Sequence, residues 1–172
     1  NLLTQQYTAE AVRFIAQNHH RPFFLFLSHA MPHTLLGASK NFRGKSGNGL
    51  YGDAVEELDW SVGEVIRVLD AFELSHRTLV VFTSDNGAAL PKDPPPEDPR
   101  WQHGGSNAPL RGGKGVTFEG GIRVPAIFWW PGTIEAGLEV TTPAVITDTI
   151  DTFAELADLP ALTTAVDAVS IA

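Results

Sequence analysis

Cysteine is absent from this sequence, and so are long apolar runs and clusters of basic residues. Without cysteine the chain forms neither disulfide bonds nor thiolate metal sites, and its redox compartment cannot be inferred. The longest apolar runs, PFFLFL and PAIFWW, are far shorter than the roughly 20 residues of a transmembrane helix. The 12 basic residues are scattered among 20 acidic ones, which gives a net charge of -8 and argues against a nucleic-acid-binding surface.

The size of the chain predicts one domain or a large piece of one. At 172 residues with 43% hydrophobic content it can bury one sizeable core. It begins at Asn1, without a charged segment followed by an apolar leader. We therefore expect the chain to be part of a longer protein.

Two helices are predicted in the first half of the chain and one near its end. Apolar residues at helical spacing indicate an amphipathic helix over residues 4–18 and a longer one over 51–72. The last helix contains Ile150 and Phe153, and Thr147 or Asp148 is its expected N-cap.

Short, uninterrupted apolar runs predict strands that are buried on both faces, at residues 23–27, 78–83 and 125–130. The first two strands and the long helix between them would form a right-handed βαβ unit. The expected fold is therefore α/β, with a mostly parallel sheet. Ligands of such sheets bind at the loops that follow the carboxyl ends of the strands.

Irregular segments separate these elements. Residues 28–49 are rich in glycine, and residues 91–99 contain too many prolines for a helix or a sheet interior. Residues 103–121 hold seven glycines. A compact domain seldom keeps such a long irregular stretch without a functional reason.

Asp85 and Asn86 follow the predicted strand at 78–83. Asp-Asn-Gly is common turn chemistry after a strand, which is one interpretation of these residues. The other is a metal site, because carboxylate and amide oxygens are ligands that Ca²⁺ and Mg²⁺ prefer. Two ligands do not fill the six to eight positions around Ca²⁺, so further ligands would have to come from elsewhere.

Histidines follow the first predicted strand. His29 and His33 lie beyond its carboxyl end, within reach of Asp85 if the two strands are neighbours. A loop histidine is usually only solvated. His33, in a loop opposite a possible metal site, is a candidate proton donor or anion ligand.

The glycine-rich segment carries Arg111, Lys114 and Arg123. It is not a P-loop, because Gly115 follows Lys114 where serine or threonine is required and no strand leads directly into it. A backbone-exposed loop that presents a lysine suits a tetrahedral anion. The alternative is a flexible surface loop with solvated charges.

Five blocks together resemble the second half of the type I sulfatases, in particular the arylsulfatase and N-acetylgalactosamine-6-sulfatase branch. They cover about residues 20–160 and read RPFFLFLSHAMPHTLLGASKNF, YGDAVEELDWSVGEVIRVLD, TLVVFTSDNGAAL, GGSNAPLRGGKGVTFEGGIRVPAIFWWPG and TDTIDTFAELADLP. The resemblance implies an alkaline-phosphatase-like sandwich, a mostly parallel sheet flanked by helices, of which residues 1–172 would be a partial domain. It also implies sulfate ester hydrolysis with a formylglycine and one Ca²⁺.

Four residues match functional positions of that family. Asp85 and Asn86 match two metal ligands in its S/T-D-N-G block, and Lys114 matches the lysine of its G-K-x-x-x-x-E-G-G block, which bridges sulfate and leaving group. His33 matches a histidine that contacts the sulfate and protonates the leaving oxygen. The resemblance favours the interpretation of Asp85 as a metal ligand over its interpretation as a turn residue.

The chain departs from the family in lacking the C/S-x-P-S-R motif of the nucleophile and the aspartate pair that completes the metal site. Both belong to the family's first half, so we expect the 172 residues alone to hydrolyse nothing. Two alternatives stay open. One is phosphate ester hydrolysis within the same superfamily, and the other is a non-catalytic binding module derived from a sulfatase.

The sequence does not name the substrate, which the resemblance limits to an aryl sulfate or a sulfated sugar. Residues 91–103, with Trp101 and His103, would either line the pocket or cap it. The resemblance also implies an exported, lysosomal or periplasmic protein.

Overall fold

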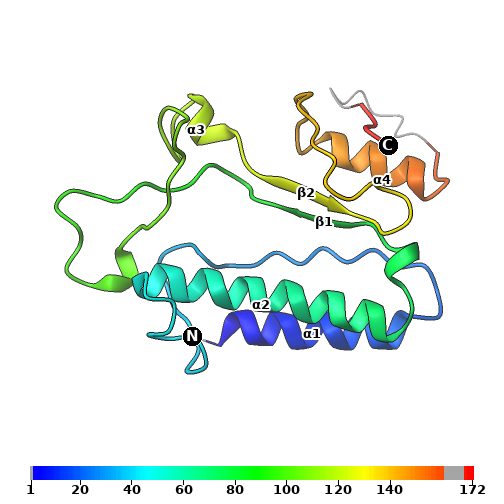
Figure 1. The fold of residues 1–172 in the computed structure, drawn as a ribbon, viewed down its shortest axis with the longest axis horizontal. Helices are drawn as coiled ribbons and strands as arrows, with labels where there is room; N and C mark the ends of the chain where they lie inside the picture. The colour runs from blue at the N-terminus through cyan, green and yellow to red at the C-terminus, as the bar shows by residue number, and fades with distance from the viewer. Residues whose placement is uncertain (1, 161–168) are drawn as a thin grey trace. The chain divides into compact units, whose positions relative to one another are not determined.

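The computed structural model describes residues 2–160 and 169–172 of the chain. Its α-helices and strands are α1 (Leu3–Asn18), α2 (Gly49–Ala71), β1 (Val80–Thr83), α3 (Glu119–Ile122), β2 (Ala126–Trp129) and α4 (Asp148–Leu156) (Figure 1), and short 3-10 helices lie at Ser75–Arg77 and Pro99–Trp101. The chain divides into two compact units, Asn1–Glu135 and Ala136–Ala172. None of the described helices combines the length and the apolar composition of a membrane span.

The two predicted helices of the first unit are confirmed, and they lie side by side (Figure 1). Ile15 of α1 and Leu69 of α2 are almost fully buried and form a core with Leu74. A polar contact accompanies this core, because the hydroxyls of Thr8 and Ser61 lie 2.6 Å apart and are both buried. The helix pair therefore provides the rigid base of the first unit.

The segment at residues 23–27 is extended, but the prediction that it forms a strand buried on both faces is wrong for the described structure. Phe23 and Leu25 pack against the core of the helix pair. Phe24 and Phe26, which point the other way, are 68% and 80% exposed. The apolar run therefore has only one covered face, and an extended segment is not a strand without a hydrogen-bonded neighbour.

Strands β1 and β2 form a two-stranded antiparallel sheet, with Val80 opposite Trp129 and Thr83 opposite Ala126. The sequence predicts a mostly parallel sheet, whereas the strands that pair within the described residues are antiparallel. After β1 the chain runs out through the long irregular segment, turns at α3 and returns beside β1 (Figure 1). A strand that returns from the same end pairs antiparallel and needs no crossover helix.

Helix α4, in the second unit, begins where the sequence predicts, with Thr147 at the N-cap position. Thr147 makes no side-chain capping bond there. The buried positions are the polar Asp148 and Thr152, whereas Ile150 is 57% exposed. The buried face differs from the predicted apolar face because Asp148 and Thr152 accept hydrogen bonds from the main-chain amides of Val169 and Ile171.

Candidate functional site

Asp85 and Asn86 lie in the loop that directly follows β1. The carboxylate of Asp85 is exposed, and no hydrogen bond or ion pair engages it within the described residues. Asn86 is half-buried, and its Nδ2 donates to the carbonyl oxygen of Gly87 at 3.2 Å. This bond turns the amide nitrogen toward the protein and leaves Oδ1 as the available acceptor.

The glycine-rich segment is fastened to this loop by main-chain hydrogen bonds. The amide of Lys114 donates to the carbonyl of Ala88 at 3.0 Å, and the amide of Gly87 donates to the carbonyl of Gly121 at 3.0 Å. The predicted metal ligands and the predicted anion-binding lysine thus belong to two segments that pair directly. The sequence separates Asp85 from Lys114, and the tertiary fold joins the segments that carry them.

Three glycines allow this packing because no side chain would fit: Gly87 and Gly113 lie where the two segments meet, and Gly120 lies within the glycine-rich segment. A Cβ atom on Gly87 would lie 1.9 Å from the carbonyl oxygen of Gly120. A Cβ on Gly113 would lie 2.7 Å from the carbonyl oxygen of Ala88, and one on Gly120 would lie 2.2 Å from that of Gly112. At these three positions glycine is therefore a packing requirement.

The three cations of this segment differ in their surroundings. The guanidinium of Arg111 lies over the ring of Phe118, 3.7 Å from its centroid. Arg123 forms an ion pair with Glu119, with 3.2 Å between Nη1 and Oε2. Lys114 is exposed and has no ion pair among the described residues. Of these three, Lys114 therefore carries the positive charge that is available to an anionic ligand.

His33 and His29 have separate environments, although the sequence places both beyond the same strand. His33 is exposed, its Nδ1 donates to the carbonyl of Thr34, and its Nε2 makes no hydrogen bond to the described residues. His29 instead lies between the helices, with Nε2 3.2 Å from the hydroxyl of Ser61, and burial lowers its pKa. Only His33 is placed to meet a ligand.

Tyr51, near the start of α2, contacts both the His33 loop and the glycine-rich segment. It packs against the buried cluster of Met31, Leu36 and Ala54, whose first two members flank His33 in sequence. On the other side its ring is so close to Gly104 that a Cβ there would lie 2.6 Å from Cγ of Tyr51. Tyr51 therefore links the segment that carries His33 to the segment that carries Lys114.

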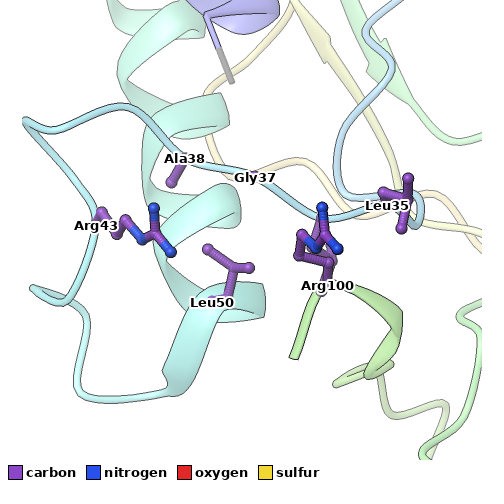
Figure 2. A pocket seen from close by; sticks show the side chains of 7 residues that line it. Leu35, Gly37, Ala38, Arg43, Leu50 and Arg100 are labelled. Carbon is purple, nitrogen blue, oxygen red and sulfur yellow. The ribbon is translucent and has the colours of Figure 1, made fainter. Parts of the chain in front are cut away.

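A cavity of about 240 Å³ opens beside the same loop, lined by Leu35, Leu36, Gly37, Ala38, Arg43, Leu50 and Arg100. Figure 2 shows the side chains of Arg43 and Arg100 at opposite ends of it. The guanidinium of Arg100 binds Asp98, with Nη2 and Oδ2 2.6 Å apart. The Pro-rich segment thus contributes Arg100 to a cavity next to the His33 loop, while Trp101 is 51% exposed.

The donor set at Asp85 and Asn86 fits a hard cation, because it consists of one unengaged carboxylate and one amide oxygen. It does not complete a site. In residues 2–160 and 169–172 no group of three or more His, Cys, Asp or Glu side chains lies close enough to hold a metal ion.

Two residues that join segments of this region, Asn107 and Tyr51, were not predicted from the sequence to do so. Asn107 makes side-chain hydrogen bonds to Ala88 and Gly112, and Tyr51 packs between two loops. An asparagine amid glycines is typical of turns, and a tyrosine at an apolar helical position is typical of a core. Neither pattern distinguishes a residue that joins two distant segments.

A model of the sulfatase family matches residues 1–160. Steryl-sulfatase of Homo sapiens is 48% identical over 158 residues, which cover 92% of this chain and 27% of the relative. N-acetylgalactosamine-6-sulfatase of Mus musculus is 47% identical over 159 residues, covering 91% of this chain and 29% of the relative. The chain thus spans a little over a quarter of the length of these curated relatives.

Among solved structures, the PsFucS1 sulfatase from Pseudoalteromonas sp. superimposes with a TM-score of 0.80 at 32% identity. The alignment covers 92% of this chain and 30% of the other. The α/β, alkaline-phosphatase-like fold expected from the resemblance is therefore confirmed, and this chain holds part of it. On its sequence and its fold, the chain belongs to the sulfatase family.

Proposed function

We propose that this chain is part of a longer protein that hydrolyses sulfate esters, and that it contributes His33, Asp85, Asn86 and Lys114 to the site. The observation that carries the proposal is the hydrogen bond between the amide of Lys114 and the carbonyl of Ala88. It ties the anion-binding lysine to the loop that holds the metal ligands. Membership of the sulfatase family supports the reaction class.

Asp85 and Asn86 would hold one Ca²⁺ through a carboxylate oxygen and Oδ1. When bound, the ion supplies positive charge that neutralises sulfate oxygens as the ester bond breaks. Its remaining ligands would come from the part of the domain that lies outside this chain. The two residues present are oxygen donors of the type that Ca²⁺ prefers.

Lys114 and His33 would have different roles at the sulfate group, charge stabilisation and proton donation. The free ammonium of Lys114 would donate hydrogen bonds to sulfate oxygens and stabilise the charge that develops on them. In His33 the Nδ1–H is bound to the carbonyl of Thr34, so the imidazolium form would carry its second proton on Nε2. Nε2 would donate that proton to the leaving ester oxygen.

The nucleophile would come from outside these 172 residues. The chain has no cysteine and no C/S-x-P-S-R motif from which a formylglycine is made. Residues 1–172 would then be a partial catalytic domain, inactive without the nucleophile-bearing half that completes the site. Exposure of Phe24 and Phe26 agrees with this proposal, because apolar side chains at those levels of exposure suit contact with further chain.

The substrate would be an aryl sulfate or a sulfated sugar. The name N-acetylgalactosamine-6-sulfatase denotes a sulfated sugar and the name steryl-sulfatase a sterol sulfate, and both are sulfate esters. An acidic protein needs only local cations to bind such an ester, and Lys114 is the cation that the site offers. By family resemblance the longer protein would be exported, lysosomal or periplasmic.

The test is sulfate release from an aryl sulfate by the full-length protein and its Lys114→Ala variant. Loss of one group that stabilises charge in a transition state lowers kcat by roughly 10²–10³-fold. Lys92→Ala is the matched control, because Lys92 is also exposed but lies in the proline-rich segment. We expect the control to retain wild-type activity.

The same assay separates the alternatives. Faster cleavage of an aryl phosphate than of the aryl sulfate by the wild-type protein would replace this function with phosphate ester hydrolysis. Cleavage of neither ester, with both still bound, would favour a non-catalytic binding module.

A further inference from the structure

The side chain of Asn107 joins the two segments that carry the candidate site residues. Its Oδ1 accepts from the amide of Ala88 at 2.9 Å, and its Nδ2 donates to the carbonyl of Ala88 at 3.0 Å and to that of Gly112 at 3.1 Å. Both main-chain groups of Ala88 are thus bound by one side chain, much as a neighbouring strand would bind them.

Ala88 and Gly112 lie close to the reactive residues along the chain. Ala88 comes two residues after Asn86, and Gly112 comes two residues before Lys114. The carbonyl of Ala88 accepts from the amide of Lys114 as well as from Asn107. Any displacement of Asn107 would therefore change the distance between the metal-ligand loop and the lysine.

The close packing around Asn107 leaves little room for another arrangement. A Cβ on Gly113 would lie 2.7 Å from the carbonyl oxygen of Ala88 and 3.2 Å from Nδ2 of Asn107. The amide is half-buried, and all its hydrogen-bonding atoms are engaged. A side chain held by three bonds in such a space has a fixed position.

From this geometry we infer that Asn107 is a positioning residue, which sets the spacing between the Asp85–Asn86 pair and Lys114. Asn107 does not itself touch the sulfate group. The inference rests on the proposed function for its kinetic consequence, but the geometric coupling can be measured without it.

The experiment compares the full-length wild-type protein with Asn107→Asp and Asn107→Ala. Asp is isosteric but has no donor for the carbonyls of Ala88 and Gly112, while Ala removes all three bonds. Ser106→Ala is the matched control, because the adjacent Ser106 is exposed and, among the described residues, its hydroxyl accepts only from the amide of Ala108 at 3.3 Å. Three quantities are measured: kcat and KM for an aryl sulfate, Ca²⁺ affinity by calorimetry, and hydrogen exchange at the amides of Ala88 and Lys114.

We expect kcat to fall about 10- to 100-fold in both Asn107 variants, with a much smaller change in KM, since a displacement of about 1 Å costs up to 10²-fold in rate. Ca²⁺ affinity should weaken, and the Ala88 and Lys114 amides should exchange faster. Ser106→Ala should match the wild type throughout. Either Asn107 variant serves if the other does not fold.

Unchanged kcat and unchanged amide exchange in a folded Asn107→Asp protein would overturn the inference. A loss of activity that only follows the fraction of folded protein would also overturn it, because it would assign Asn107 a purely structural role. If the wild type releases no sulfate, the proposed function fails. Amide exchange and Ca²⁺ affinity then still decide whether Asn107 sets the spacing.

Discussion

At the scale of single residues, Asp53 shows how one carboxylate can fix a loop. Asp53 is buried in the first turns of α2 and accepts hydrogen bonds from the amides of Gly44, Lys45 and Ser46 and from the hydroxyl of Ser46, at 2.7–3.2 Å. Burial by itself would raise the pKa of Asp53. These donors outweigh burial and hold the pKa below its usual value.

We predict that Asp53→Asn destabilises the full-length protein by about 1–3 kcal/mol, because an amide nitrogen would face main-chain donors that then lack a partner. The pKa is lower in the folded protein than in the unfolded chain, where it is about 3.9. The stabilisation by the carboxylate is therefore complete above about pH 4 and is lost as the pH falls through the lower, folded pKa. Urea unfolding of both proteins from pH 7 to pH 3 measures the difference.

Asp59→Asn is the control, since Asp59 is exposed on the same helix. It should unfold like the wild type at every pH. A difference between Asp53→Asn and wild type that stays constant below pH 4 would contradict the role given to the ionised carboxylate.

Individual site residues were predicted from the sequence to different degrees. Asp85 follows a strand and Lys114 lies exposed in a glycine-rich loop, as the sequence predicts, because both features are local. His29 and His33 carry no local signal that distinguishes them. They differ because His29 contacts Ser61 of α2, which is 32 residues away in the sequence.

At the scale of elements, the pairing of the β1 loop with the glycine-rich segment depends on backbone proximity. We predict that Gly87→Ala destabilises the full-length protein by about 1–3 kcal/mol, because its Cβ would collide with the main chain of Gly120, which cannot move aside as a flexible side chain could. Gly63→Ala is the matched substitution inside α2. Its Cβ would meet only the end of Arg67, at 3.8 Å.

The two substitutions should have opposite signs. Alanine in a helix interior is about 0.5–1 kcal/mol more favourable than glycine, so Gly63→Ala should stabilise the protein. Urea unfolding measures both effects. Equal stabilities for Gly87→Ala and wild type would show that the loops do not approach as closely as described.

Helices were easier to predict from the sequence than strands. The apolar periodicity of α1 and α2 predicts where each helix lies, although their buried positions include polar residues such as Thr8, Asp53 and Ser61. A strand needs a partner, and residues 23–27 do not reveal whether one is present. Nor does the apolar run AIFW reveal that β2 would pair antiparallel with β1.

At the scale of the whole molecule, the chain exposes more apolar surface than an independent domain usually does. Phe24, Phe26 and Ile127 are 68%, 80% and 58% exposed. We predict that the 172 residues alone self-associate or melt without cooperativity, and that they release no sulfate from an aryl sulfate. Sedimentation velocity, calorimetry and a sulfate assay test this, and a monomer with a sharp two-state melt or with activity above buffer would contradict it.

The sequence by itself indicated the family and the helices and supplied candidate residues for metal and anion binding, because these depend on residue type and local spacing. Only the tertiary structure decided which of them meet. It joined the Asp85 loop to the Lys114 segment through Ala88, and it separated His29 from His33. The physical reason is that hydrogen bonds and close backbone packing act between segments far apart in the chain, where no local pattern of residues records them.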